Sequence, residues 1–218
     1  MKHTERQIQL LKQKILNEGG LVEEAIANAI AALVNRDANL AQKVINEDQI
    51  IDQMEVEVEE DCLKILALYQ PVAADLRFVV AILKINNDLE RIGDLAKNIA
   101  KRASYLAKRD PQDLRINLRE MATKVQAMVK LSLDSLVNGS PALARQVRAE
   151  DDEVDRHREV IRDVIMREIR NSPAQVESLL KLNSVSKHLE RIADMATNVA
   201  EDVIYMVEGE IVRHKLHD

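Results

Sequence analysis

The stretch LERIGDLAKNIA at residues 89–100 occurs a second time as LERIADMATNVA at residues 189–200. Eight of the twelve positions are identical in the two copies. Each copy holds a glutamate followed four residues later by an aspartate, and this spacing places both carboxylates on one face of an α-helix. The acidic pairs are Glu90 with Asp94 and Glu190 with Asp194. The chain is therefore an internal duplication, and its repeated unit carries an acidic pair.

The composition of the chain is typical of a helical protein. Of 218 residues, 46% are hydrophobic, five are glycine, four are proline and 2% are aromatic. Alanine, leucine, valine, glutamate, lysine and arginine dominate, which suits helices better than sheets. We predict an all-α fold. The single cysteine, Cys62, lies on an apolar-periodic segment and is expected to be a buried structural thiol.

Charge and hydropathy argue against several classes of protein. The longest apolar run, residues 78–83, is far shorter than the roughly 20 residues that span a bilayer. The first residues lack the apolar core of a signal peptide. We therefore expect a soluble, cytoplasmic protein that meets membrane complexes only peripherally. The net charge is −6 with scattered lysines and arginines, which argues against nucleic-acid binding.

Turn residues divide the chain into six long helical stretches. The breaks are NRDAN at 35–39, residues 69–71, DP at 110–111, NGSP at 138–141, NSP at 171–173 and Gly209. Ser140 and Ser172 each precede a proline, which is the order expected at a helix start. The repeat and the short turns predict two tandem, pseudo-symmetric three-helix bundles, residues 1–109 and 110–218. The Gly19-Gly20 pair could kink or break the first helix.

The turn between the second and third helices places four carboxylates at one height. Asp52 and Glu90 are equally far in sequence from Pro71, one before it and one after it. The same holds for Asp48 and Asp94, one helical turn further from the proline on each side. In an antiparallel hairpin all four lie about 28–35 Å from the turn, at roughly 1.5 Å per residue. We call this set (Asp48, Asp52, Glu90, Asp94) the first carboxylate cluster.

The second copy repeats this arithmetic around Pro173. The resulting second carboxylate cluster consists of Asp151, Asp155, Glu190 and Asp194. The two copies are not equal, because Arg158 and Arg162 stand at the positions of Glu55 and Glu59 in the first copy. The second acidic stripe is therefore shorter, and metal binding is expected more strongly at the first cluster than at the second.

Carboxylate ligands favour hard, oxygen-preferring metal ions. Mg²⁺, Mn²⁺ and Ca²⁺ suit such ligands, iron is also compatible, and Zn²⁺ is the least favoured. We predict that both carboxylate clusters bind divalent or iron metal ions. Two alternatives remain open at this point: an acidic docking surface that steers basic partners without metal, and an inert solvated face.

The sequence offers no motif for catalysis. It contains no Gly-rich phosphate loop, His-Glu-x-x-His helix, Gly-x-Ser-x-Gly elbow or kinase signature. The paired carboxylates stand on long regular helices without a neighbouring nucleophile or an evident substrate pocket. We predict that the protein is not an enzyme. A carboxylate-bridged metalloenzyme is the less favoured alternative.

Several segments together resemble the PhoU family of phosphate-uptake accessory proteins. They are LERIGD at 89–94, LERIAD at 189–194 and QPVAADLRFV at 70–79, set in two similar copies that cover nearly the whole chain. The resemblance implies two three-helix bundles, a cytoplasmic location, homodimers and metal clusters held by paired acidic motifs. Those motifs map onto the eight residues of the first and second carboxylate clusters.

The resemblance also implies a regulatory role. A PhoU protein acts as a negative regulator of phosphate uptake and of the phosphate-starvation response. When phosphate is plentiful, it restrains the Pst phosphate transporter and holds the PhoR sensor kinase in its inhibitory state. The implied partners are the transporter's ATPase subunit, PstB, and PhoR, and the implied activity is that of an adaptor between them.

Overall fold

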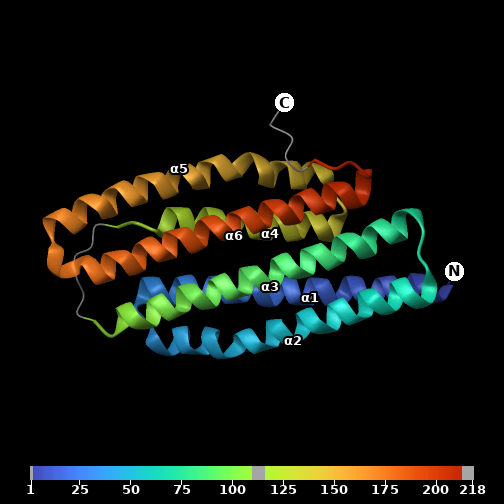
Figure 1. Ribbon diagram of the computed structural model, residues 1–218, viewed down its shortest axis with the longest axis horizontal. Helices are drawn as coiled ribbons and strands as arrows, with labels where there is room; N and C mark the ends of the chain where they lie inside the picture. Colours follow the sequence, from blue (N-terminus) through green and yellow to red (C-terminus); the bar gives the residue numbers. More distant parts are fainter. Residues whose placement is uncertain (1, 110–115, 213–218) are drawn as a thin grey trace.

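The computed structural model describes residues 2–109 and 116–212 (Figure 1). Over these residues the chain forms six α-helices and one short 3-10 helix, and no β-strand. The elements are α1 (Lys2–Asn35), α2 (Ala38–Tyr69), α3 (Ala73–Ala107), α4 (Arg119–Asn138), α5 (Pro141–Asn171), η1 (Pro173–Gln175) and α6 (Val176–Glu208). The predicted all-α fold is confirmed. The predicted boundary between residues 109 and 110 lies at the edge of the described residues and stays a prediction.

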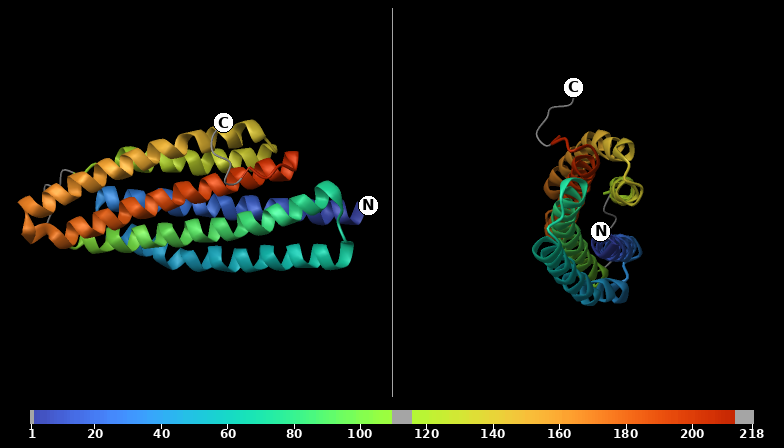
Figure 2. Two further views of the ribbon diagram at one scale, coloured as in Figure 1. Left: turned by 45° about the horizontal axis from the view of Figure 1, so that its top comes forward. Right: turned by 90° about the vertical axis from the view of Figure 1, so that its right-hand side faces the viewer.

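The six helices form two three-helix bundles, α1 with α2 and α3, and α4 with α5 and α6. Helices α3 and α6 lie side by side in the middle of the molecule, with α2 and α5 at the outer edges (Figure 1). The end view in Figure 2 shows these four helices in one curved row, with α1 and α4 on one side of it. Buried side chains of all six helices join one hydrophobic core. The duplicated segments therefore lie at the centre of the molecule.

Local sequence sets several of the helix ends. The Asp37 carboxylate begins α2 by accepting hydrogen bonds from two backbone amides of its first turn, both at 2.9 Å. Ser140 caps α5, as predicted, by accepting one hydrogen bond of 3.4 Å from a backbone amide of the first turn, and Gly139 ends α4 with a left-handed φ of 55°. Ser172 differs from the prediction because its side chain caps no helix. The chain first makes the 3-10 turn that opens at Pro173, and α6 follows.

The first helix stays continuous across Gly19 and Gly20, so the break considered from the sequence does not occur. A Cβ at Gly19 would lie 2.7 Å from Cδ2 of Leu133 on α4, whereas nothing lies within 4 Å of a Cβ at Gly20. Gly19 therefore serves the close approach of α1 and α4 rather than a bend.

Burial follows the apolar stripes of the helices. Ile15, Ile85 and Ile92 are fully buried. Cys62 is buried as predicted, and burial raises the pKa of its thiol to about 12. Within the described ranges, none of the helices has the length and apolarity that a membrane span needs.

Candidate functional site

The first carboxylate cluster lies where α2 and α3 run antiparallel. Glu90 on α3 is half-buried, and burial together with the charges of Asp94, Asp52, Glu55 and Asp48 raises its pKa. Burial and the charge of Asp48 likewise raise the pKa of Asp52. The structure thus brings the four carboxylates of the cluster close enough to repel one another.

Lys97 lies inside this cluster, and it was missed in the sequence. Its Nζ lies 2.5 Å from Oδ2 of Asp48 and 3.0 Å from Oδ1 of Asp94. Because the Asp48 side chain is only 4% exposed, the ammonium group compensates a charge that burial disfavours. The hydrogen bond from Lys97 to Asp48 raises the pKa of the lysine. The sequence did contain a sign of this contact, because Lys97 follows Asp94 by one helical turn and could therefore reach it. The second copy has Thr197 at this position.

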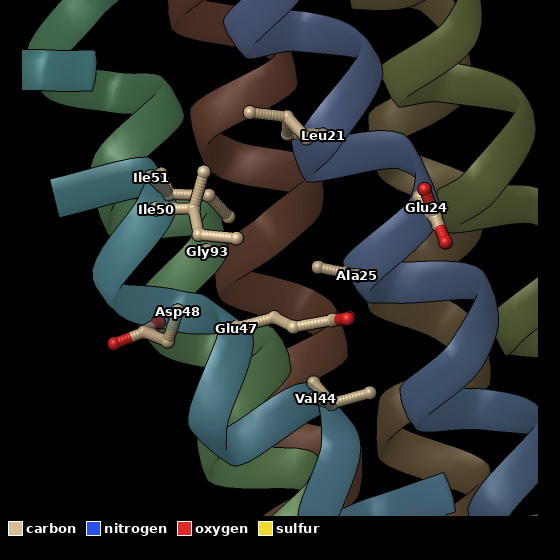
Figure 3. A pocket seen from close by; sticks show the side chains of 9 residues that line it. All are labelled: Leu21, Glu24, Ala25, Val44, Glu47, Asp48, Ile50, Ile51 and Gly93. Carbon is tan, nitrogen blue, oxygen red and sulfur yellow. The ribbon is translucent and has the colours of Figure 1, made fainter. Parts of the chain in front are cut away.

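A small cavity of about 110 Å³ borders the first cluster between α1, α2 and α3. Figure 3 shows Asp48 and Glu47 pointing to opposite sides of α2, with Glu47 directed across the cavity. Most of the lining is apolar, including Val44 and Ile51. The polar part of the lining consists of the acidic residues Glu24, Glu47 and Asp48, without a basic side chain among the lining residues.

The second carboxylate cluster lies between α5 and α6 and has a different counter-charge. Burial and the charges of Asp151, Glu190 and Asp155 raise the pKa of Asp194 to about 6. Nε of Arg158 on α5 lies 3.5 Å from Oε2 of Glu190. The four carboxylates are again brought together, but the basic groups beside them are arginines: Arg158 pairs with Glu190, and the charge of Arg191 partly opposes the rise in the pKa of Asp194.

The two clusters are connected by a groove between α3 and α6. Its volume is about 420 Å³, and corresponding residues of both copies line it. Arg91 and Asp94 lie on one side, and Arg191 and Asp194 on the other. The duplicated motif therefore presents acidic and basic groups of both bundles on one surface.

Glu18 on α1 is a buried carboxylate that the sequence reasoning did not single out. Its side chain is 0% exposed, and neither carboxylate oxygen has a hydrogen-bond partner. Burial, followed by the charges of Glu55 and Glu90, raises its pKa to about 8. The signal was its place in the core stripe of α1, between Ile15 and Val22.

The clusters supply oxygen ligands but not a formed metal site. In residues 2–109 and 116–212, no group of three or more His, Cys, Asp or Glu side chains is arranged to hold a metal ion. In the first cluster, Lys97 contributes to this because it occupies oxygens of Asp48 and Asp94. A metal ion would bind there only if Lys97 withdrew. The metal role of the eight carboxylates stays a prediction.

Comparisons with known proteins agree with the duplicated fold. The PhoU domain family model matches residues 15–103 and 118–203, one match in each bundle. The chain is 40% identical to the "phosphate-specific transport system accessory protein PhoU homolog" of Aquifex aeolicus over 96% of this chain and 95% of that protein. A protein of the same name from Caulobacter vibrioides is 38% identical over 92% and 87%, respectively.

Solved structures give the same result. The crystal structure of PhoU from Pseudomonas aeruginosa aligns with a TM-score of 0.90 and 36% identity, covering 94% of this chain and 99% of that one. The phosphate transport system regulatory protein PhoU from Streptococcus pneumoniae aligns with a TM-score of 0.89 and 29% identity, covering 96% and 99%. With both bundles matched by the family model and by relatives over nearly their whole length, the chain belongs to the PhoU family.

Proposed function

We propose that this protein is an accessory protein of a phosphate-specific transport system and a negative regulator of phosphate uptake and of the phosphate-starvation response. The observation that carries the proposal is that relatives bearing this accessory-protein name align with both bundles over nearly the whole chain. The protein acts without catalysis, as an adaptor between the Pst phosphate transporter and the PhoR sensor kinase.

The proposed partners are PstB, the ATPase subunit of the transporter, and PhoR. The adaptor works at the cytoplasmic side of the membrane, where the ATPase subunit is reached. We also propose that it acts as a homodimer, as the family resemblance implies. Light scattering on the purified protein would then give twice the chain mass of 24.7 kDa, whereas the single-chain mass would contradict the dimer.

The adaptor's carboxylate clusters are proposed to bind divalent or iron metal ions. Two observations support this. The ligands are all oxygen, and the pKa values of Glu90 and Asp194 are raised first by burial and then by repulsion among the carboxylates, both of which a cation offsets. A metal-free acidic docking surface is the second candidate. It is favoured by Lys97 and Arg158, which already neutralise part of each cluster.

Paired substitutions test the adaptor and the clusters together. We expect Glu90→Ala/Asp94→Ala and Glu190→Ala/Asp194→Ala each to lose bound metal and to weaken binding to purified PstB and PhoR. Elemental analysis and a binding titration measure the two effects on the same samples. Loss of partner binding without any metal in the wild-type protein would favour the docking surface.

The control is another acidic pair with the same spacing. Glu159 and Asp163 are exposed on α5, outside both clusters. Glu159→Ala/Asp163→Ala removes the same charge from the chain and is expected to leave metal content and partner binding unchanged. If folded cluster variants bind both partners as the wild type does, the clusters are not needed for the adaptor role.

A further inference from the structure

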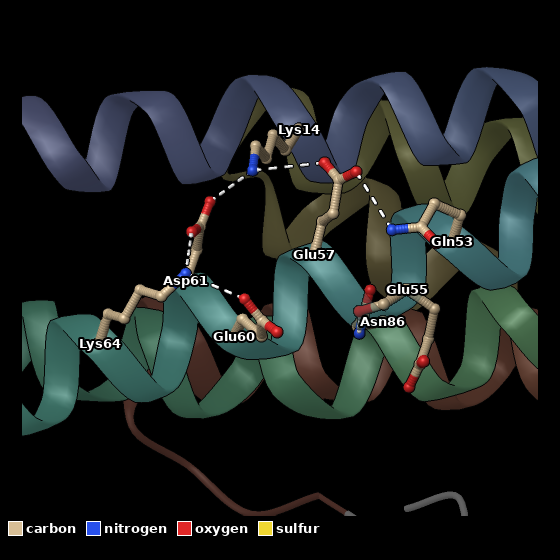
Figure 4. A network of polar contacts seen from close by, with 8 residues as sticks. All are labelled: Lys14, Gln53, Glu55, Glu57, Glu60, Asp61, Lys64 and Asn86. Atoms are coloured by element: carbon tan, nitrogen blue, oxygen red, sulfur yellow. Dashed lines mark hydrogen bonds and ion pairs between the residues drawn. The ribbon is translucent and has the colours of Figure 1, made fainter.

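At one level of the first bundle, each of the three helices carries a residue with a side-chain oxygen. Glu18 is as far from the end of α1 at Asn35 as Glu55 is from the start of α2 at Ala38. Because these antiparallel helices are joined by a short turn, the two residues are level. On α3, Nδ2 of Asn86 donates to the backbone oxygen of Glu55 at 2.9 Å (Figure 4). We call Glu18, Glu55 and Asn86 the acceptor layer.

The acceptor layer holds buried oxygens that bond to no protein group. Both carboxylate oxygens of Glu18 and Oδ1 of Asn86 lack a hydrogen-bond partner, and the two side chains are 0% and 1% exposed. Buried polar atoms of this kind are costly unless a donor or a cation meets them. The charges of Glu55 and of Glu90, one turn further along α3, add to burial in raising the pKa of Glu18.

Two basic residues of the first bundle, Lys14 and Lys97, are engaged elsewhere. Lys14, one turn before Glu18 on α1, lies 2.6 Å from Asp61 and 3.6 Å from Glu57 (Figure 4). Lys97 is held by the first carboxylate cluster. In the described part of the chain, no ion pair reaches either Glu18 or Glu55. The layer therefore has acceptors and negative charge but no positive charge of its own.

At the corresponding level, the second bundle contains a basic side chain, Arg158. Counted from the end of α4 at Asn138 and from the start of α5 at Pro141, Met121 and Arg158 correspond to Glu18 and Glu55. Arg158 is 8% exposed, and its Nε lies 3.5 Å from Glu190. At the level where the first bundle has two carboxylates, the second bundle has a methionine and a built-in cation.

We propose that the acceptor layer binds a hard divalent cation such as Mn²⁺ or Mg²⁺, which takes the place that Arg158 fills in the second bundle. Two carboxylates and an amide oxygen, completed by water, are ligands that such ions prefer. A basic side chain of a partner protein is excluded because Glu18 is fully buried. The site is distinct from the first carboxylate cluster, since it shares no ligand with it.

The test replaces residues of the first bundle with the residues that stand at the corresponding positions of the second bundle. Glu18→Met removes a ligand, and Glu55→Arg supplies the cation from within. We expect each variant to bind one Mn²⁺ fewer per chain than the wild type, as counted by titration calorimetry and by the paramagnetic resonance signal of free Mn²⁺. Glu59→Arg is the matched control, because it makes the same charge change at an exposed position one turn away on α2.

The same variants in an Asp48→Ala/Asp94→Ala background separate the layer from the first carboxylate cluster. The loss of one Mn²⁺ with Glu18→Met is expected to persist there. Mn²⁺ should also raise the Tm of the wild type, relative to EDTA, by more than it raises the Tm of Glu18→Met. If the wild type and Glu18→Met bind equal amounts of Mn²⁺ and show equal Tm shifts, the proposal is overturned. Glu18 would then be neutralised by a proton instead of a metal ion.

Discussion

Glu18 lies in the core stripe of α1, at a position that Met121 fills in the second bundle. Its pKa of about 8 is well above the ordinary value of 4.5, chiefly because burial disfavours the ionised carboxylate. Between these two pH values the folded chain holds a proton at Glu18 that the unfolded chain releases. The free energy of unfolding therefore falls as the pH rises from 4.5 to about 8.

Replacing Glu18 with glutamine isolates this effect. In EDTA, we expect the wild type to lose stability relative to Glu18→Gln as the pH rises from about 4.5 to 8, by about 5 kcal/mol at most. Urea unfolding of both proteins across this range measures the difference. Parallel stability curves would show that the Glu18 carboxyl does not titrate in this interval.

Residue positions along a helix could be predicted better than the contacts between helices. Counting from the turn at Pro71 placed Asp52 and Glu90 together, because rise per residue and turn length are local properties. The roles of Lys97 and Glu18 were not predicted, because the groups that surround each side chain belong to other helices. Their rotation toward Asp48 and toward the core is set by packing, which residue spacing alone does not determine.

At the scale of the element, α1 and α4 show how packing outweighs propensity. Two glycines in the middle of a helix predict a weak point, yet α1 is continuous because its apolar stripe is buried on both sides of the pair. The cap at Ser140 was predicted from the sequence, since it is a contact within one turn, whereas at Asp37 only the break between helices was predicted and not the cap itself. The 3-10 turn at Pro173 was not predicted. Ser172 followed by Pro173 also suits an ordinary N-cap, and the sequence does not distinguish that cap from a 3-10 turn.

The two glycines of α1 should respond differently to alanine. Gly20→Ala is expected to raise the free energy of unfolding by about 0.5–1 kcal/mol, because alanine favours the helix and nothing lies within 4 Å of the new Cβ. Gly19→Ala should gain less or lose stability, since Leu133 must move aside. Urea unfolding of the two variants compares them directly. An equal gain in both would show that the contact between α1 and α4 tolerates the extra carbon.

At the scale of the whole molecule, the two bundles share a core. Helices α3 and α6 each complete their own bundle and also pack against each other, and buried residues of all six helices form one cluster. Sequence repeats predicted two units, but the duplication alone does not say how far the units depend on each other. That dependence comes from the apolar area between α3 and α6, which neither bundle covers alone.

The shared core predicts that both bundles unfold together. We expect one transition in scanning calorimetry, with the calorimetric enthalpy equal to the van't Hoff enthalpy. Residues 1–109 expressed alone should then be less stable than the full chain or should self-associate, because α3 has lost its contact with α6. Two resolved transitions in the full chain would contradict this and identify the bundles as independent domains.

Lys97 has one more consequence for the first carboxylate cluster. A side chain tethered a few bonds from its partners competes with dissolved ions at a local concentration fixed by the fold. Any ion entering between Asp48 and Asp94 must displace this competitor from both carboxylates. The proposed metal site of the first cluster would therefore fill only above a threshold concentration that Lys97 sets, and removing the lysine side chain would lower that threshold.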